Sequence, residues 1–142
     1  MKAVIQRVRK AALSVDGKVI SAIEQGLVVY LGIHDGDTVS DIDKFCNKLA
    51  AMRIFEDEGG KLNLSVRDIG GSVLLVSNFT LCANIQRGNR PDFTAAMKPD
   101  PARKLFDECA QKLNALVPTV TGVFGADMTI EQSNDGPITI IY

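Results

Sequence analysis

The chain has 142 residues, of which 46% are hydrophobic and 23% charged, and its formal net charge is −1. This composition is that of a globular protein, and the length is enough for a single domain, residues 1–142, with a hydrophobic core. The small net charge excludes nucleic-acid binding through overall electrostatic attraction, so any RNA contact must come from a local patch.

Apolar periodicity, glycine-bounded apolar runs and helix caps predict the secondary structure. A two-residue turn at Asp16-Gly17 joins the strands of a hairpin. The first helix follows Thr38, with Asp41 in a spacing close to a capping box, and the second begins at Asp100-Pro101. The expected strands are 4–8, 13–15, 18–20, 26–33, 72–79, 119–130 and 137–142, and the expected helices are 38–52 and 100–116.

These elements indicate an α/β fold with a single mixed, sheet-rich domain and two amphipathic helices packed on the sheet. Two helices are few to cover so many strands. We therefore expect part of the sheet to face another sheet, its own in a barrel-like packing or that of a partner.

The three cysteines, Cys46, Cys82 and Cys109, are widely separated. This pattern fits a reducing compartment and argues against a disulfide framework or a zinc site. The sequence has no phosphate-binding glycine loop or dinucleotide fingerprint, and we expect no metal and no cofactor. It also has no signal-peptide core or membrane-spanning run, so we expect a cytoplasmic protein without a membrane partner.

Small polar residues interrupt two apolar stretches where strands are expected. The first interruption is Ser77-Asn78-Phe79-Thr80, at the end of a strand that looks buried. The second is Asn134-Asp135-Gly136-Pro137, which lies between Ile130 and the β-branched run 138–141. A shared pocket is the simplest reason for both, and we expect the two stretches to form one.

The first of these stretches carries no predictable side-chain base. A nucleophilic Thr80 would need a base within hydrogen-bond reach. The only histidine, His34, is interpreted as a solvated turn residue. The backbone N–H groups of Phe79 and Thr80 are better candidates, because a strand that stops pairing can direct them at a developing oxyanion. Cys82 has no basic neighbour in sequence to activate its thiol, and we interpret it as core or pocket wall.

A polar loop after the first stretch carries two arginines. Arg87 and Arg90 suit phosphate contacts, and Phe93 is placed to stack on a nucleobase. A solvated surface turn explains the same residues equally well. The sequence leaves both interpretations of the loop open.

The second stretch has an arginine as its expected partner. By period-two alternation, Arg7 and Arg9 share one face of the first strand, and Val4 and Val8 share the other. Backbone carbonyls around Gly136-Pro137 are the expected acceptors of such an arginine. The Gly136-Pro137 bond is either cis, as about 5–6% of such bonds are, or trans at the start of an edge strand.

Together these residues resemble the D-aminoacyl-tRNA deacylase family over the whole chain. Single short motifs are weak signals, but an ordered set along a full-length domain is strong. The motifs that carry the resemblance are Ala3–Val8, Arg53–Asp57, Asn63–Ser65, Leu81, Gly88–Pro91, Phe124–Met128 and Asn134–Thr139.

The resemblance implies a homodimer that hydrolyses the ester joining a D-amino acid, or glycine, to the 3′-terminal adenosine of a tRNA. Gly136-Pro137 matches the family's cis Gly-Pro element, which reaches across the dimer into the partner's pocket, and Arg7 matches the arginine that orients it. Ser77–Thr80 matches the catalytic strand end, in which Phe79 and Thr80 carry the oxyanion amides.

The resemblance further implies that Phe124 and Met128 bind substrate and that Arg87 and Arg90 contact tRNA with salt-sensitive affinity. A rigid backbone wall would exclude an L side chain by collision while glycine passes. The RNA would assist attack by water while the protein supplies positioning and amides. A covalent nucleophile at Thr80 is the second interpretation of the same motif.

One residue departs from the family pattern, which usually reads Ser-Gln-Phe-Thr where this chain has Asn78 in place of Gln. The side chain is shorter by roughly 1 Å of reach, and a misplacement of that size costs about a hundredfold when the group positions substrate. Three alternatives stay open: an editor of mischarged L-aminoacyl-tRNA in the same fold, a catalytically silent tRNA-binding dimer, and a structural dimer with no RNA role.

Overall fold

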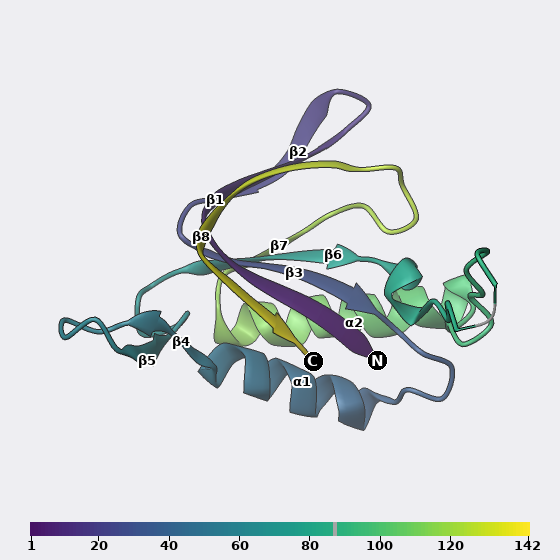
Figure 1. The fold of residues 1–142 in the computed structure, drawn as a ribbon, viewed down its shortest axis with the longest axis horizontal. Coiled ribbons are helices and arrows are strands. Elements are labelled where there is room, and N and C mark those ends of the chain that lie inside the picture. Colours follow the sequence, from purple (N-terminus) through teal and green to yellow (C-terminus); the bar gives the residue numbers. More distant parts are fainter. Residues whose placement is uncertain (87) are drawn as a thin grey trace.

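The structure, a computed structural model, describes residues 1–86 and 88–142. Figure 1 shows a curved sheet with two helices on one side and a small hairpin at one end. In chain order the elements are β1 (Lys2–Val15), β2 (Lys18–Ile23), β3 (Gly26–Gly32), α1 (Val39–Ala51), β4 (Arg53–Glu56), β5 (Leu62–Ser65), β6 (Ser72–Ser77), the 3₁₀ helix η1 (Phe79–Cys82), α2 (Pro99–Leu116), β7 (Thr119–Thr121) and β8 (Thr129–Ile141).

The main sheet has the strand order β2-β1-β3-β6-β7, and β8 pairs with β1. Pairing is antiparallel around β1 and parallel from β3 to β6 to β7. The carboxyl ends of these three parallel strands therefore lie at the same edge of the sheet. Loops at such an edge commonly carry ligand-binding groups in α/β proteins.

Each face of the sheet buries its own apolar cluster. One cluster lies between the sheet and the two helices, which cover the same face in Figure 1, and includes Ile5, Leu27, Phe45 and Leu113. The other lies on the opposite face, under the arch formed by β2 and β8, and includes Val28 and other side chains of β1, β3 and β6. Successive side chains of one strand point to opposite faces of the sheet and therefore alternate between the two clusters.

The sheet curls into a nearly closed barrel. The terminal strands of its path, β2 and β7, approach each other where Ser21 Oγ donates a hydrogen bond of 2.6 Å to the Thr121 carbonyl oxygen. The predicted mixed, sheet-rich fold with barrel-like packing and two helices is thus confirmed.

The two helices pack against each other through two of the three cysteines, Cys46 and Cys109. The Sγ atoms of Cys46 and Cys109 lie 3.7 Å apart, and both residues are buried. The hydrogen bond with Cys46, together with burial, raises the pKa of the Cys109 thiol. At the surface, Lys112 bridges from α2 to Asp43 on α1.

The predicted helix starts are correct to within two residues. The Asp41 carboxylate accepts a hydrogen bond of 2.9 Å from the Thr38 backbone N–H, as a capping box requires. The second helix begins at Pro99 rather than at Asp100-Pro101, because Pro99 already fits the first helical position, and Lys98 occupies the N-cap position without a side-chain hydrogen bond.

Several strands differ from prediction. The strand expected at 72–79 ends at Ser77, because the next residues turn into η1. The segments 4–8 and 13–15 form one strand, β1. The interruption between the last two strands lies at 122–128, where the apolar residues had suggested a strand. At 131–136, where an interruption was expected, β8 continues and pairs with β1 through a bulge. The short hairpin of β4 and β5 was not predicted.

Among the described residues, none of the helices combines the length and the apolar character that a membrane crossing requires.

The contact between β3 and β6 gives a stability prediction. A Cβ atom on Gly26 would lie 1.9 Å from the Ser72 carbonyl oxygen, so Gly26→Ala must push two paired strands apart. We expect the free energy of unfolding in urea to fall by about 3 kcal/mol. Gly59→Ala is the control, because its Cβ would meet only the Asp57 side chain, at 3.2 Å. Equal losses in the two variants would contradict this account.

Candidate active site

The carboxyl end of β6 turns abruptly away from the sheet. The Asn78 N–H still bonds to the Leu31 carbonyl of β3, at 2.8 Å, and is the last such link. The chain then enters η1, whose first N–H groups have no partner within the helix. The backbone amides of Phe79 and Thr80 donate no hydrogen bond to any residue that the structure describes. Two adjacent amides are thus free to bind an anionic oxygen.

The side chains of this turn bond to each other. Thr80 Oγ1 donates a hydrogen bond of 2.5 Å to the Asn78 Oδ1 carbonyl oxygen. A carboxamide oxygen is too weak a base to take the proton of a hydroxyl group. This geometry gives Asn78 and Thr80 a bracing role in η1. Ser77, the last residue of β6, is partly buried beside them.

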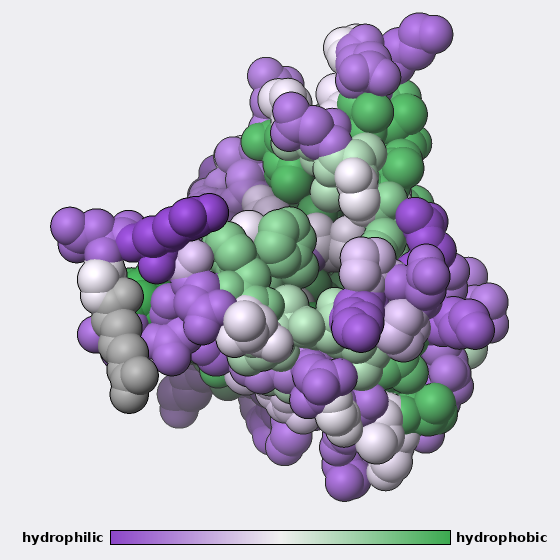
Figure 2. Space-filling model, turned by 90° about the vertical axis from the view of Figure 1, so that its right-hand side faces the viewer, coloured by the Kyte–Doolittle hydropathy of each residue, from purple (hydrophilic) through white to green (hydrophobic). Residues whose placement is uncertain are grey.

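Two further loops meet the same edge of the sheet. The Gly122 N–H donates to the Leu75 carbonyl at 3.1 Å, so the loop 122–128 continues alongside the end of β6. In the loop 83–97, the Met97 N–H donates to the Ile33 carbonyl just after β3, at 3.0 Å. Figure 2 views this end of the molecule and shows an apolar hollow rimmed by hydrophilic residues.

The two predicted substrate-binding residues of the 122–128 loop contact different parts of the protein. Phe124 packs towards α2, with the Arg103 guanidinium 4.8 Å from the centre of its ring and the Phe106 ring 5.8 Å away. Met128 packs against the cluster under the arch. Phe124 and Met128 therefore belong to one loop but pack against different parts of the protein, α2 and the cluster under the arch. Arg103, which also donates to the Phe124 carbonyl, was not recognised from the sequence.

The Gly136-Pro137 segment forms a bulge in β8 that is held by a buried arginine. Arg7 is 4% exposed, and its Nε lies 3.1 Å from Asp135 Oδ2 and 3.3 Å from the Asp135 carbonyl oxygen. Its Nη1 donates to the Ile54 carbonyl at 2.9 Å. The prediction that carbonyls beside Gly136-Pro137 accept from Arg7 is confirmed, and the peptide bond is cis.

Arg9 also reaches Asp135, at 3.3 Å, but its side chain is 76% exposed. The two arginines thus converge on one carboxylate, although only Arg7 is buried. A pocket of about 380 Å³ lies beside them, lined by Arg7, Arg9, Gln25, Phe55, Glu56, Ile69, Asp135 and Gly136.

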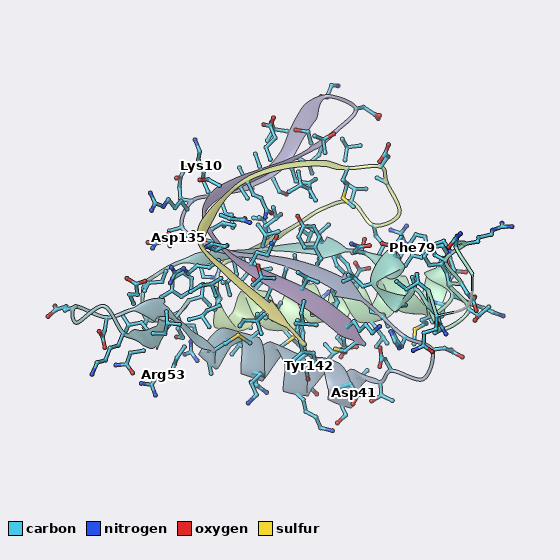
Figure 3. All side chains as sticks on the ribbon, viewed as in Figure 1. Lys10, Asp41, Arg53, Phe79, Asp135 and Tyr142 are labelled. Carbon is cyan, nitrogen blue, oxygen red and sulfur yellow. The ribbon has the colours of Figure 1, made fainter. Side chains whose placement is uncertain are left out.

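The two polar stretches do not form one pocket within a protomer. Arg7 lies opposite Leu27 of β3, whereas Ser77 lies opposite Leu31. These positions are four residues apart along β3, or about 13 Å at 3.3 Å per residue. Figure 3 shows Phe79 and Asp135 at opposite ends of the strands. The expectation of a shared pocket is therefore wrong for a single chain.

Two other candidate groups do not supply a nucleophile or a base at this edge. Cys82 is buried, its Sγ bonds to the Ile33 carbonyl, and burial raises the pKa of its thiol. His34 is half-buried rather than solvated, and its Nε2 has no hydrogen-bond partner among the described residues. Burial and then the α-ammonium group lower the pKa of His34, so its imidazole is a weaker base than a solvated histidine, and its Nε2 is buried away from solvent.

The arginine-bearing loop is only partly described. Arg90 is exposed, and Arg87, the other predicted tRNA contact, lies outside the described residues.

Comparisons with known proteins agree over the full chain. A family model described as D-Tyr-tRNA(Tyr) deacylase matches residues 4–142. A solved structure described as "c-Myc DNA Unwinding Element Binding Protein" is 40% identical, with a TM-score of 0.95, covering 100% of this chain and 97% of that one. A second, described as "Structural Analysis of a probable eukaryotic D-amino acid tRNA deacylase", shares the fold at 16% identity and a TM-score of 0.87, covering 99% and 97%. The chain therefore belongs to the D-Tyr-tRNA deacylase family of hydrolases, which act on the ester bond of aminoacyl-tRNA.

Proposed function

We propose that this chain acts as a homodimer that hydrolyses D-aminoacyl-tRNA, accepts glycyl-tRNA, including glycine mischarged on tRNA-Ala, and spares L-aminoacyl-tRNA. The observation that carries the proposal is the pair of free amides at Phe79 and Thr80. Family membership identifies the bond that is cleaved. The amides meet the main electrostatic need of that cleavage, which is to stabilise the negative charge that develops on the carbonyl oxygen.

Besides the two amides, the reaction requires the protein mainly to position the ester and the attacking water. Water attacks the ester carbonyl carbon, the carbonyl oxygen becomes an oxyanion bound by the amides, and the 3′-oxygen of the ribose leaves with a proton. An aminoacyl ester is already activated, and the neighbouring 2′-hydroxyl can relay the proton from the water. Because the Thr80 hydroxyl donates to an amide carbonyl and not to a base, Thr80 acts as a brace rather than a nucleophile.

Discrimination between enantiomers would come from the main chain at Gly136 and Pro137. The two enantiomers place the side chain and the hydrogen on opposite sides of the same carbon, so a fixed wall can exclude one of them by collision. Arg7 fixes this segment through the carboxylate and carbonyl of Asp135. Glycine has no side chain to collide with the wall, and it passes.

In the proposed dimer, the wall and the amides of one site come from two protomers. The carbonyl and α-carbon of an ester are directly bonded, whereas Arg7 and Ser77, which lie next to the wall and the amides, pair with positions of β3 about 13 Å apart. A second copy can bring its Gly136 and Pro137 to the amides of the first. Support for this assembly comes from β8, which pairs only with β1 among the described strands and leaves its other edge open to another chain.

The test of the function is hydrolysis of D-Tyr-tRNA, L-Tyr-tRNA and Gly-tRNA at matched enzyme concentration. We expect rapid loss of the D and glycyl esters while the L ester persists, because the wall meets only the L side chain. Cleavage of both tyrosyl esters would instead indicate an editor of mischarged L-aminoacyl-tRNA. Binding of the tyrosyl-tRNAs without cleavage would indicate a catalytically silent protein.

Proline substitution isolates the amide from the side chain at position 79. Phe79 is the first residue of η1, where a proline ring is tolerated but its N–H is missing. We expect kcat of Phe79→Pro to be about 100-fold below that of Phe79→Ala, which keeps the amide. Thr80→Ala should lose less than about tenfold, since the hydroxyl only braces the turn. A larger loss in Thr80→Ala than in Phe79→Pro would support the nucleophile mechanism.

Mixed dimers test the shared site. Gly136→Ala displaces the wall, because a Cβ at φ +118° would lie 2.8 Å from the Ile138 nitrogen. We expect neither the Phe79→Pro homodimer nor the Gly136→Ala homodimer to show selective hydrolysis of D-Tyr-tRNA. A purified heterodimer of the two keeps one intact site and should recover about half of the activity of the wild-type dimer. No recovery in a stable heterodimer would show that each site belongs to one chain.

A further inference from the structure

Two aromatic side chains form an exposed pair next to the free amides. The rings of Phe79 and Phe93 meet edge to face with their centres 5.3 Å apart. They are nonetheless 59% and 37% exposed, respectively. Phe79 also carries one of the two amides, so the pair begins where the ester is expected to bind.

The backbone beneath the pair is firmly anchored. Asn84 and Asp92 exchange two backbone hydrogen bonds, of 2.7 and 3.0 Å, which close the loop on itself. The Asp35 N–H donates to the Ala95 carbonyl at 3.0 Å and ties the loop to the end of β3. The exposure of Phe93 is therefore a property of a fixed surface, and exposed apolar patches on such surfaces mark binding sites.

The described part of the loop that carries Phe93 also holds one exposed arginine and one exposed aspartate. Arg90 is exposed in the same loop and forms no ion pair within the part of the chain that the structure describes. The carboxylate in the loop, Asp92, accepts hydrogen bonds from the N–H and the hydroxyl of Thr94, at 2.9 and 3.1 Å. An exposed aromatic pair with an exposed arginine in the same loop suits unpaired nucleotides, which bind through base stacking and phosphate contacts.

We propose that Phe79 and Phe93 form a stacking platform for the unpaired nucleotides immediately before the esterified adenosine of the tRNA. The inference rests on the proposed function, because it takes the amides as the site of the ester. A tRNA ends in single-stranded nucleotides, and with the adenosine ester at the amides the preceding bases must leave across the adjacent surface. Sequence-tolerant stacking there would help the enzyme to bind tRNAs that carry different amino acids.

The test compares two small substrates, the D-tyrosyl ester of adenosine and the D-tyrosyl ester of the trinucleotide CpCpA. We expect kcat/KM of the wild-type protein to be about tenfold higher for the trinucleotide, which corresponds to about 1.4 kcal/mol. Phe93→Ala should remove most of this advantage, and Phe93→Tyr, which keeps the ring, should retain it. Ile85→Ala is the matched control, because Ile85 is an exposed apolar residue of the same loop, 72% exposed, outside the pair.

Three outcomes would overturn the platform. In the first, kcat/KM of Phe93→Ala for both substrates equals that of the wild type. In the second, kcat/KM falls by the same factor for both substrates, which indicates a structural role for Phe93. In the third, Phe93→Ala separates the dimer in sedimentation, which indicates that a second copy of the chain covers the pair. If the wild type cleaves neither of these esters nor D-Tyr-tRNA, the proposed function fails, and the platform is tested by binding of unesterified CpCpA. In that case about tenfold weaker binding by Phe93→Ala supports the platform, and equal binding rejects it.

Discussion

The buried guanidinium of Arg7 is the constraint on which the most unusual part of the structure depends. A cation removed from water needs an opposite charge and a full set of acceptors. Arg7 obtains them from the Asp135 carboxylate and carbonyl on β8 and from the Ile54 carbonyl on β4, above the ring of Phe55. One side chain thereby fixes three segments that are far apart in the sequence. The bulge that carries Gly136 and Pro137 is shaped by this requirement.

The register of the sheet decides where the proposed chemistry would occur. The parallel strands β3, β6 and β7 bring their carboxyl ends to one edge, where the free amides lie. The bulge lies at the level of Leu27, towards the amino end of β3. In the proposed dimer β8 has two roles, since the strand that carries the bulge also has the open edge. Assembly and choice of enantiomer would then be linked through one strand.

The sequence predicts the buried helices and strands of this protein better than the residues at which the strands end. Periodicity and caps identify the two helices and the central strands, because burial imposes those patterns on the residues themselves. The polar stretches 77–80 and 134–137 were correctly recognised as exceptional, but their separation depends on strand register, which no local pattern encodes. Arg103 over Phe124 and the Asn78–Thr80 hydrogen bond were missed for a similar reason. Each depends on side-chain positions set by tertiary packing or by an unforeseen turn.

The free amides at Phe79 and Thr80 belong to the main chain, and this has an evolutionary consequence. Ordinary point mutations replace side chains and leave backbone N–H groups in place, with proline as the exception. The side chains of such a site can therefore change without loss of the groups that we propose to bind the oxyanion. The same property bears on inhibition. A compound that hydrogen-bonds to these two amides leaves the target few substitutions by which resistance could arise.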